Sequence, residues 1–216
     1  MAGGARYGVG GADEGRSRVS KRTAGEPPSG FQELRDRVLI HLWQIRKIQK
    51  KHPEYTMALL IAIASEALSR CLAKKGHSEF LRLLKRKYDV PEPVGHALFR
   101  AVRNGLAHVY DTALIEVGQD KVVVVIAWNR PAMHLRVQTR DWLREGRQRP
   151  GVYLDMETMW QDLVANLKKL RRALQENAAL SRKFSRQLRK LQDKYMVRVT
   201  RADDIAAWQK FLKDRS

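Results

Sequence analysis

The sequence has a single cysteine, Cys71, and no apolar run as long as the ~20 residues that a membrane-spanning helix needs. One cysteine excludes both an intrachain disulfide framework and a zinc site built from several cysteines. Residues 1–15 also lack the apolar core of a secretion signal. We therefore expect no membrane partner, a cytoplasmic location, and Cys71 in the core.

Several motifs of common enzyme classes are also missing. The sequence has no GxxxxGK[ST] phosphate loop, no strand-following GxGxxG and no serine nucleophile elbow. Five histidines are scattered without HExxH or another ligand spacing, so we predict no metal site and no cofactor. These histidines are His41, His52, His77, His96 and His134.

What the sequence has in excess is positive charge. It contains 42 lysines and arginines against 23 acidic residues, which gives a net charge of +19 and a pI near 10.5. A protein this basic attracts polyanions at physiological salt, and nucleic acid is the usual one. We expect RNA or another nucleic acid as partner; the alternative is that the charge only keeps the protein soluble.

Apolar spacing predicts a mainly α-helical protein after a disordered tail at 1–30, which is rich in glycine, serine, arginine and proline. Positions three and four residues apart mark four helices before residue 110. Their predicted ranges are about 31–51, 54–75, 78–88 and 94–107.

A β-rich insertion is predicted at 113–154, where β-branched runs replace helical spacing. We expect a small antiparallel hairpin or three-stranded sheet, then a basic loop at 140–149 and a short strand at 152–154. Asp155 should cap a long helix that follows.

The C-terminal part is predicted to be helical and very basic. Between 168 and 194 there are ten basic residues and two acidic ones, an excess of eight positive charges. This segment is either a solvated helix face or a nucleic-acid-binding arm. The candidate nucleic-acid contacts are Arg140, Arg144, Lys168, Lys169, Arg171, Arg172, Arg182, Lys183, Arg186, Arg189 and Lys190.

The predicted organisation is therefore one helical domain at 31–176, carrying the β insertion, and a basic helical extension at 177–216. Thr200-x-x-Asp203 resembles a capping box and should start a last helix within that extension.

The segment from Arg103 to Tyr110 concentrates polar chemistry at the predicted end of a helix. An arginine is a permanent forked cation suited to phosphate oxygens, and a histidine exchanges protons near neutral pH. Cleavage of RNA without a metal needs both functions, so Arg103, Asn104 and His108 are the candidate catalytic residues.

The spacing of these residues sets a condition on any site. Five residues of a straight helix turn about 500°, which leaves Arg103 and His108 roughly 140° apart, whereas Asn104 and His108 share a face. Convergence needs a loosened helix at Asn104-Gly105, an arginine that reaches around, or a second subunit, and the last favours a homodimer. Alternatively both side chains only stabilise the helix C-terminus.

The same segment, Arg-Asn-x-x-x-His-x-Tyr after a helical pair, resembles the Arg-x4–6-His signature of the HEPN superfamily. The tyrosine two residues after the histidine resembles the HepT-type toxins of that superfamily. The resemblance covers about 31–112, with the helix after Asp155 as a candidate addition, and the β insertion and basic extension depart from the compact toxins. The motif together with the β-hairpin and the Asp-capped helix is more similar to uncharacterised bacterial HEPN-like proteins.

This resemblance implies an antiparallel helical bundle in which Arg103 and His108 are catalytic. It also implies that Tyr110 is a modification site for a partner nucleotidyltransferase antitoxin. The expected function is a metal-independent endoribonuclease, as a toxin or defence-like effector. The alternative is a non-catalytic HEPN-like module that binds nucleic acid or protein.

Overall fold

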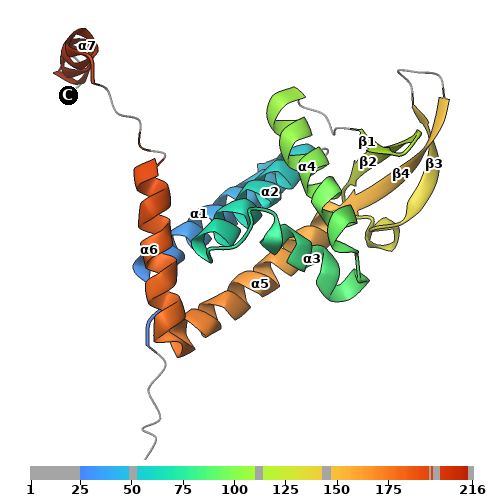
Figure 1. The fold of residues 1–216 in the computed structure, drawn as a ribbon, viewed down its shortest axis with the longest axis horizontal. Coiled ribbons are helices and arrows are strands. Elements are labelled where there is room, and N and C mark those ends of the chain that lie inside the picture. Colours follow the sequence, from blue (N-terminus) through green and yellow to red (C-terminus); the bar gives the residue numbers. More distant parts are fainter. Residues whose placement is uncertain are drawn as a thin grey trace, which may run out of the picture.

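The computed structural model describes residues 25–48, 53–109, 114–142, 147–194, 196 and 200–213. Seven α-helices and a four-stranded sheet form this part of the chain (Figure 1). The helices are α1 (Ser29–Ile48), α2 (Glu54–Cys71), α3 (Ser78–Tyr88), α4 (Glu92–Val109), α5 (Met156–Glu176), α6 (Ala178–Lys194) and α7 (Ala202–Lys213).

The prediction of a mostly helical protein is confirmed. The four helices expected before residue 110 are present, and α3 has the predicted bounds. Helix α2 is central and packs against α1, α3, α4, α5 and α6. It can do so because its own alanines and aliphatic residues occupy nearly all of its sides. Cys71 is fully buried at its end, as expected.

The predicted antiparallel hairpin is present, but the sheet that contains it is mixed and has four strands. Strands β1 (Ile115–Val117), β2 (Asp120–Ala127), β3 (Val137–Trp142) and β4 (Arg147–Asp155) form a mixed sheet in the order β1-β2-β4-β3. Strand β2 pairs in parallel with β4, at Val123 opposite Gly151, and the other pairs are antiparallel. The chain crosses past a short 3-10 turn at Pro131–Met133, so that β3 becomes an edge and β4 returns between β2 and β3.

The predicted basic loop at 140–149 is wrong at both of its ends. Arg140 pairs with Arg149, and Trp142 with Arg147, so these residues belong to strands β3 and β4. Before Gly151, β4 pairs only with β3, so both segments lie at the edge of the sheet, where charged residues are typical, and this explains why the pattern resembled a loop.

The predicted cap at Asp155 is confirmed and joins the sheet to α5. Its carboxylate accepts hydrogen bonds from the backbone N–H of Thr158 at 2.9 Å and from that of Arg130 at 2.7 Å. The N–H of Asp155 donates to Nδ1 of His134 at 3.0 Å, and His134 is buried. One fully buried aspartate therefore fixes the end of β4, the β2–β3 connection and the start of α5 together.

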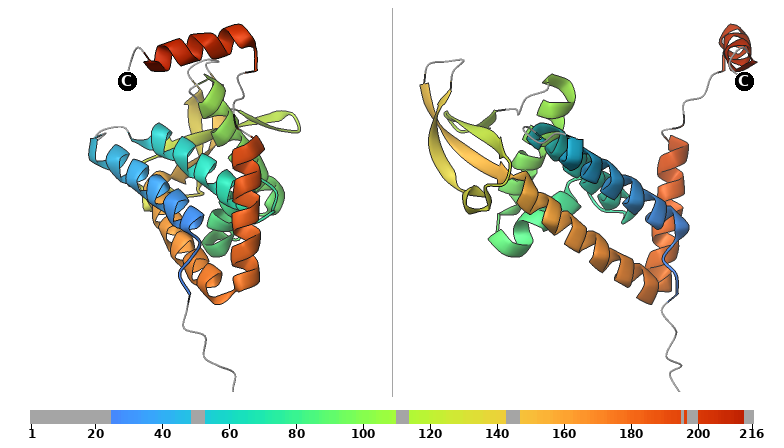
Figure 2. Two further views of the ribbon diagram at one scale, coloured as in Figure 1. Left: turned by 90° about the vertical axis from the view of Figure 1, so that its left-hand side faces the viewer. Right: turned by 180° about the vertical axis from the view of Figure 1, so that it is seen from behind.

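Helix α6, with which the predicted extension at 177–216 begins, packs against the core. Phe184 is fully buried and meets Phe31 of α1 edge to face, with ring centroids 5.6 Å apart. Helix α5 ends before Asn177, where the chain changes direction, and α6 packs on α1 and α2 (Figure 2). Among the helices of the described residues, only α7 stands away from the bundle.

The predicted tail boundary shifts by two residues, because α1 begins at Ser29 and Phe31 is already in the core. Residues 1–24 lie outside the described part of the chain. Within the described ranges, none of the helices combines the length and the apolar character needed to cross a bilayer.

Candidate functional site

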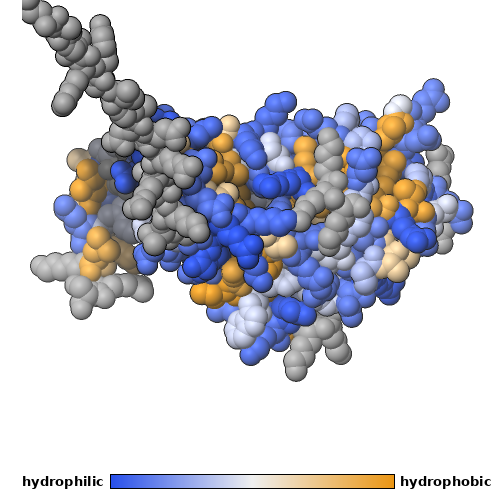
Figure 3. Space-filling model, turned by 90° about the horizontal axis from the view of Figure 1, so that it is seen from below, coloured by the Kyte–Doolittle hydropathy of each residue, from blue (hydrophilic) through white to orange (hydrophobic). Residues whose placement is uncertain are grey.

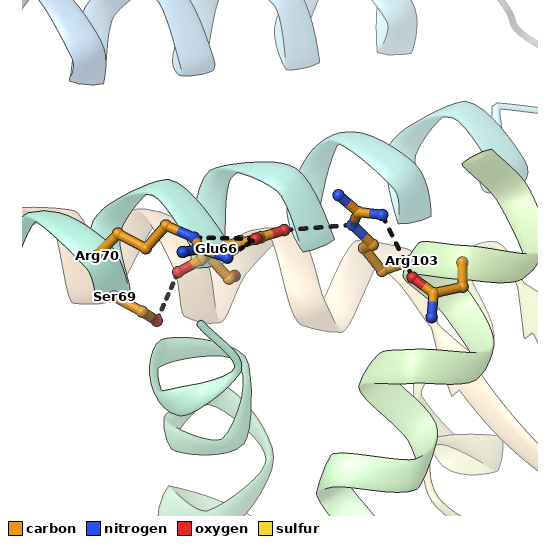
Figure 4. A network of polar contacts seen from close by, with 6 residues as sticks. Glu66, Ser69, Arg70 and Arg103 are labelled. Carbon is orange, nitrogen blue, oxygen red and sulfur yellow. Dashed lines mark hydrogen bonds and ion pairs between the residues drawn. The ribbon is translucent and has the colours of Figure 1, made fainter. Parts of the chain in front are cut away.

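Arg103 lies where α4 crosses α2, and it is held there by Glu66. Its Nε donates to Oε2 of Glu66 at 3.2 Å, and its Nη1 donates to Oδ1 of Asn104 at 3.3 Å. The other oxygen of Glu66 accepts from Nε and Nη2 of Arg70, at 3.0 and 2.7 Å (Figure 4). Arg103 is thus one end of an Arg70–Glu66–Arg103 network that links the two helices.

The network keeps Glu66 ionised. Burial raises the pKa of its carboxyl, but the hydrogen bonds and charges of Arg70 and Arg103 outweigh burial, so the pKa lies below its ordinary value of 4.5. At neutral pH the carboxylate therefore holds the Nε side of Arg103. Sequence reasoning missed Glu66, since the two residues are 37 positions apart.

Arg103 and His108 do not share a face of α4. The helix runs without a break from Glu92 to Val109, so the loosened helix at Asn104-Gly105 is not observed. Position 108 follows Asn104 by one turn and lies about 140° from Arg103 around the axis. Because the helix is continuous, a site shared by Arg103 and His108 still requires a second subunit or a long reach of the arginine. The side chain of His108 lies outside the described atoms and Tyr110 outside the described residues.

Asn104 opens instead on a pocket between α4 and the start of β1. The pocket has a volume of about 270 Å³ and is lined by Ala97, Arg100, Ala101, Asn104, Leu114 and Ile115. Arg100 is exposed at its rim and precedes Asn104 by one turn. Sequence reasoning missed Arg100, although the spacing of Arg100, Asn104 and His108, four residues each, places the three positions in one row on α4.

A second polar cluster lies at the other end of α4. The rings of His77 and His96 stack with centroids 4.2 Å apart and an interplanar angle of 34°. Burial lowers the pKa of His77, the charges of His96 and Lys75 lower it further, and Glu92 opposes the shift.

This cluster predicts an acid-sensitive fold. A lowered pKa means that the folded state binds the His77 proton less readily than the unfolded chain does. The contribution is complete above the unfolded pKa of about 6.5 and is lost as pH falls through that value towards the folded pKa. We expect the melting temperature to fall between about pH 7 and about pH 5.5, and His77→Gln to reduce that fall. His41→Gln on the exposed side of α1 is the control, and an unchanged pH dependence in His77→Gln would contradict the assignment.

The basic residues of the C-terminal segment occupy two helices, and α5 and α6 meet in a V at Asn177 (Figure 1). Arg140 lies in β3 with its side chain outside the described atoms, and Arg144 lies outside the described residues. Figure 3 shows one face of the molecule, on which hydrophilic residues predominate and hydrophobic ones form separate patches. The four predicted contacts on α5, Lys168, Lys169, Arg171 and Arg172, are all exposed.

The five predicted contacts on α6 lie on its outer side, and we call them the basic face of α6. They are Arg182, Lys183, Arg186, Arg189 and Lys190. All are exposed, whereas Phe184 points to the opposite side, into the core. A groove of about 590 Å³ runs beside this face, lined by Ser181, Arg182, Ser185, Arg186, Arg189, Lys190 and Asp193.

In the described part of the chain, no group of three or more His, Cys, Asp or Glu residues is arranged to hold an ion. His134 has a structural role there, through its bond to Asp155 and an edge contact with Tyr88. Burial raises the pKa of the Cys71 thiol to about 11, so it is a poor nucleophile at neutral pH.

Comparison with family models, with curated proteins and with solved structures finds no match for this chain in any of the three.

Proposed function

We propose that this protein binds nucleic acid through the basic face of α6. The observation that carries the proposal is the state of these five side chains: among the described residues, none of them forms an ion pair. Elsewhere on the molecule arginines such as Arg46, Arg70 and Arg103 are paired with glutamates.

Unpaired cations on one rigid face suit a phosphate backbone. The core contacts of Phe184 hold α6 against the bundle, so little ordering entropy is lost when the face binds. The groove beside it adds the hydroxyl of Ser181, which can donate to a phosphate oxygen, whereas the Ser185 hydroxyl donates to the Ser181 carbonyl at 3.1 Å. The exposed lysines and arginines of α5 extend the positive surface across Asn177.

The salt dependence of binding tests this proposal. Each neutralised phosphate contributes about 0.7 to the slope of log K against log salt for a single strand and about 0.9 for a duplex. Five contacts predict a slope of about −3.5 to −4.5, measured by fluorescence anisotropy from about 50 to about 200 mM salt. A flat salt dependence, or no binding of labelled RNA or DNA at the lowest salt, would refute nucleic-acid binding.

As a second candidate we propose metal-independent RNA cleavage at α4. It is supported by the row formed by Arg100, Asn104 and position 108, and by the pocket that Arg100 and Asn104 line. In this proposal His108 moves the proton, and an arginine, Arg100 of the same chain or Arg103 of a second chain, stabilises the phosphoryl charge.

The corresponding prediction is cleavage of RNA in EDTA that is lost on His108→Ala. A general acid or base contributes about 10²- to 10⁴-fold to the rate, so the loss should be of that order in a gel assay. His41→Ala serves as the control. Equal cleavage by His108→Ala and the unsubstituted protein would end the catalytic proposal but leave nucleic-acid binding intact.

A further inference from the structure

Helix α7 exposes an apolar face along its whole length. Trp208 and Phe211 are 53% and 48% exposed and meet edge to face, with centroids 5.7 Å apart. Ile205 and Leu212 lie on the same side of the helix and are also exposed. A helix of 12 residues is marginal in water by itself, so an amphipathic helix of this length depends on packing for its stability.

Helix α1 carries a matching apolar stripe on its outer side. Ile40 and Trp43, three residues apart, are 52% and 50% exposed, whereas Leu42 on the opposite side is buried. Lys47 follows Trp43 by one turn, and its Nζ lies 4.2 Å from the centroid of the Trp43 ring.

The two helices match in register and in charge when they run antiparallel. Asp204 precedes Trp208 by four residues, and Lys47 follows Trp43 by four. Placing Trp208 against Trp43 therefore sets Asp204 beside Lys47 at one end. At the other end it brings Phe211 to Ile40, whereas Ile205 falls opposite Arg46.

We propose that α7 of one chain docks antiparallel on α1 of a second copy, and that two copies exchange these helices reciprocally. The views show α7 away from its own bundle, which leaves the α1 stripe of that chain uncovered (Figures 1 and 2). The seven residues between α6 and α7 can span roughly 23–25 Å when extended, enough to reach a neighbouring molecule. A two-fold arrangement uses each contact twice, which compensates for the small area of one helix.

Sedimentation equilibrium tests the proposal with full-length variants. The unsubstituted protein is expected to be a dimer, and both Trp43→Ala and Trp208→Ala are expected to be monomers at the same concentration. Ile63→Ala removes a comparably exposed apolar side chain from α2 and should leave the dimer intact. A monomeric unsubstituted protein, or a dimer that survives Trp208→Ala, overturns the proposal; circular dichroism melts verify that each variant folds.

Charge reversal and mixing then test the partners. Lys47→Asp and Asp204→Lys should each weaken the dimer, and the two together should restore it. A Trp43→Ala chain mixed with a Trp208→Ala chain retains one intact pair of α7 and α1, so native mass spectrometry should detect the mixed dimer. Failure of both the charge rescue and the mixed dimer means that α7 does not dock on α1 of a second copy.

Discussion

The triple variant Arg182→Gln, Arg186→Gln, Arg189→Gln is expected to bind a single strand about 100-fold and a duplex about 500-fold more weakly at about 0.1 M salt. Three lost phosphate contacts remove about 2.1 units of log K for a single strand and about 2.7 for a duplex at that salt. The salt slope should fall by the same amounts. Anisotropy titrations of one labelled strand at several salt concentrations measure both quantities.

The control for this variant removes the same number of charges elsewhere. Lys75, Arg130 and Arg136 are exposed and lie outside α5 and α6, and glutamine at all three leaves the net charge equal to that of the triple variant. If net charge alone attracts the polyanion, both triple variants will weaken binding equally, and the assignment to α6 fails. If α6 is the binding face, the control should keep nearly the full salt slope.

Phe184→Ala is expected to destabilise the protein by about 3–5 kcal/mol, the cost typical of removing a buried phenylalanine. The side chain is fully buried against Phe31, so its loss leaves a cavity between α6 and α1. Urea unfolding followed by circular dichroism measures the change in the free energy of unfolding.

Phe211→Ala provides the comparison, because it makes the same chemical change on α7. Its side chain is half exposed, so the expected change for a single chain is within about 0.5 kcal/mol. Both variants are measured at a protein concentration below the dissociation constant of the proposed dimer, so that the exchange of α7 between chains does not contribute to the result. Equal, small effects of the two variants would mean that α6 does not depend on the core for its place in the fold.

Much of the helical fold could be predicted because its signals are local. The spacing of apolar residues predicted α1 to α4, and one aspartate before an amphipathic run predicted the cap at Asp155. The sheet order could not be predicted, because the parallel pairing of β2 with β4 depends on residues about 28 positions apart, such as Val123 and Gly151.

The candidate site shows the same limit. The sequence was sufficient to identify Arg103, Asn104 and His108 as candidates, and to predict that Arg103 and His108 lie on different sides of a straight helix. The partner of Arg103 was not, because Glu66 meets it only after α2 and α4 have packed. The helical spacing of Phe184 and its apolar neighbours indicated that α6 can pack, but not which helices it would contact, because α1 and α2 are distant in the sequence.

If nucleic acid binds as proposed, helix α6 links binding to folding. Its arginines and lysines repel one another on the surface while Phe184 holds the same helix to the bundle, so a bound polyanion relieves strain on an element that the core requires. A ligand that binds only the folded chain at 100 times its dissociation constant stabilises it by about 2.7 kcal/mol. Nucleic acid would then act as a folding cofactor, and the abundance of intact protein in the cell would follow the supply of its ligand.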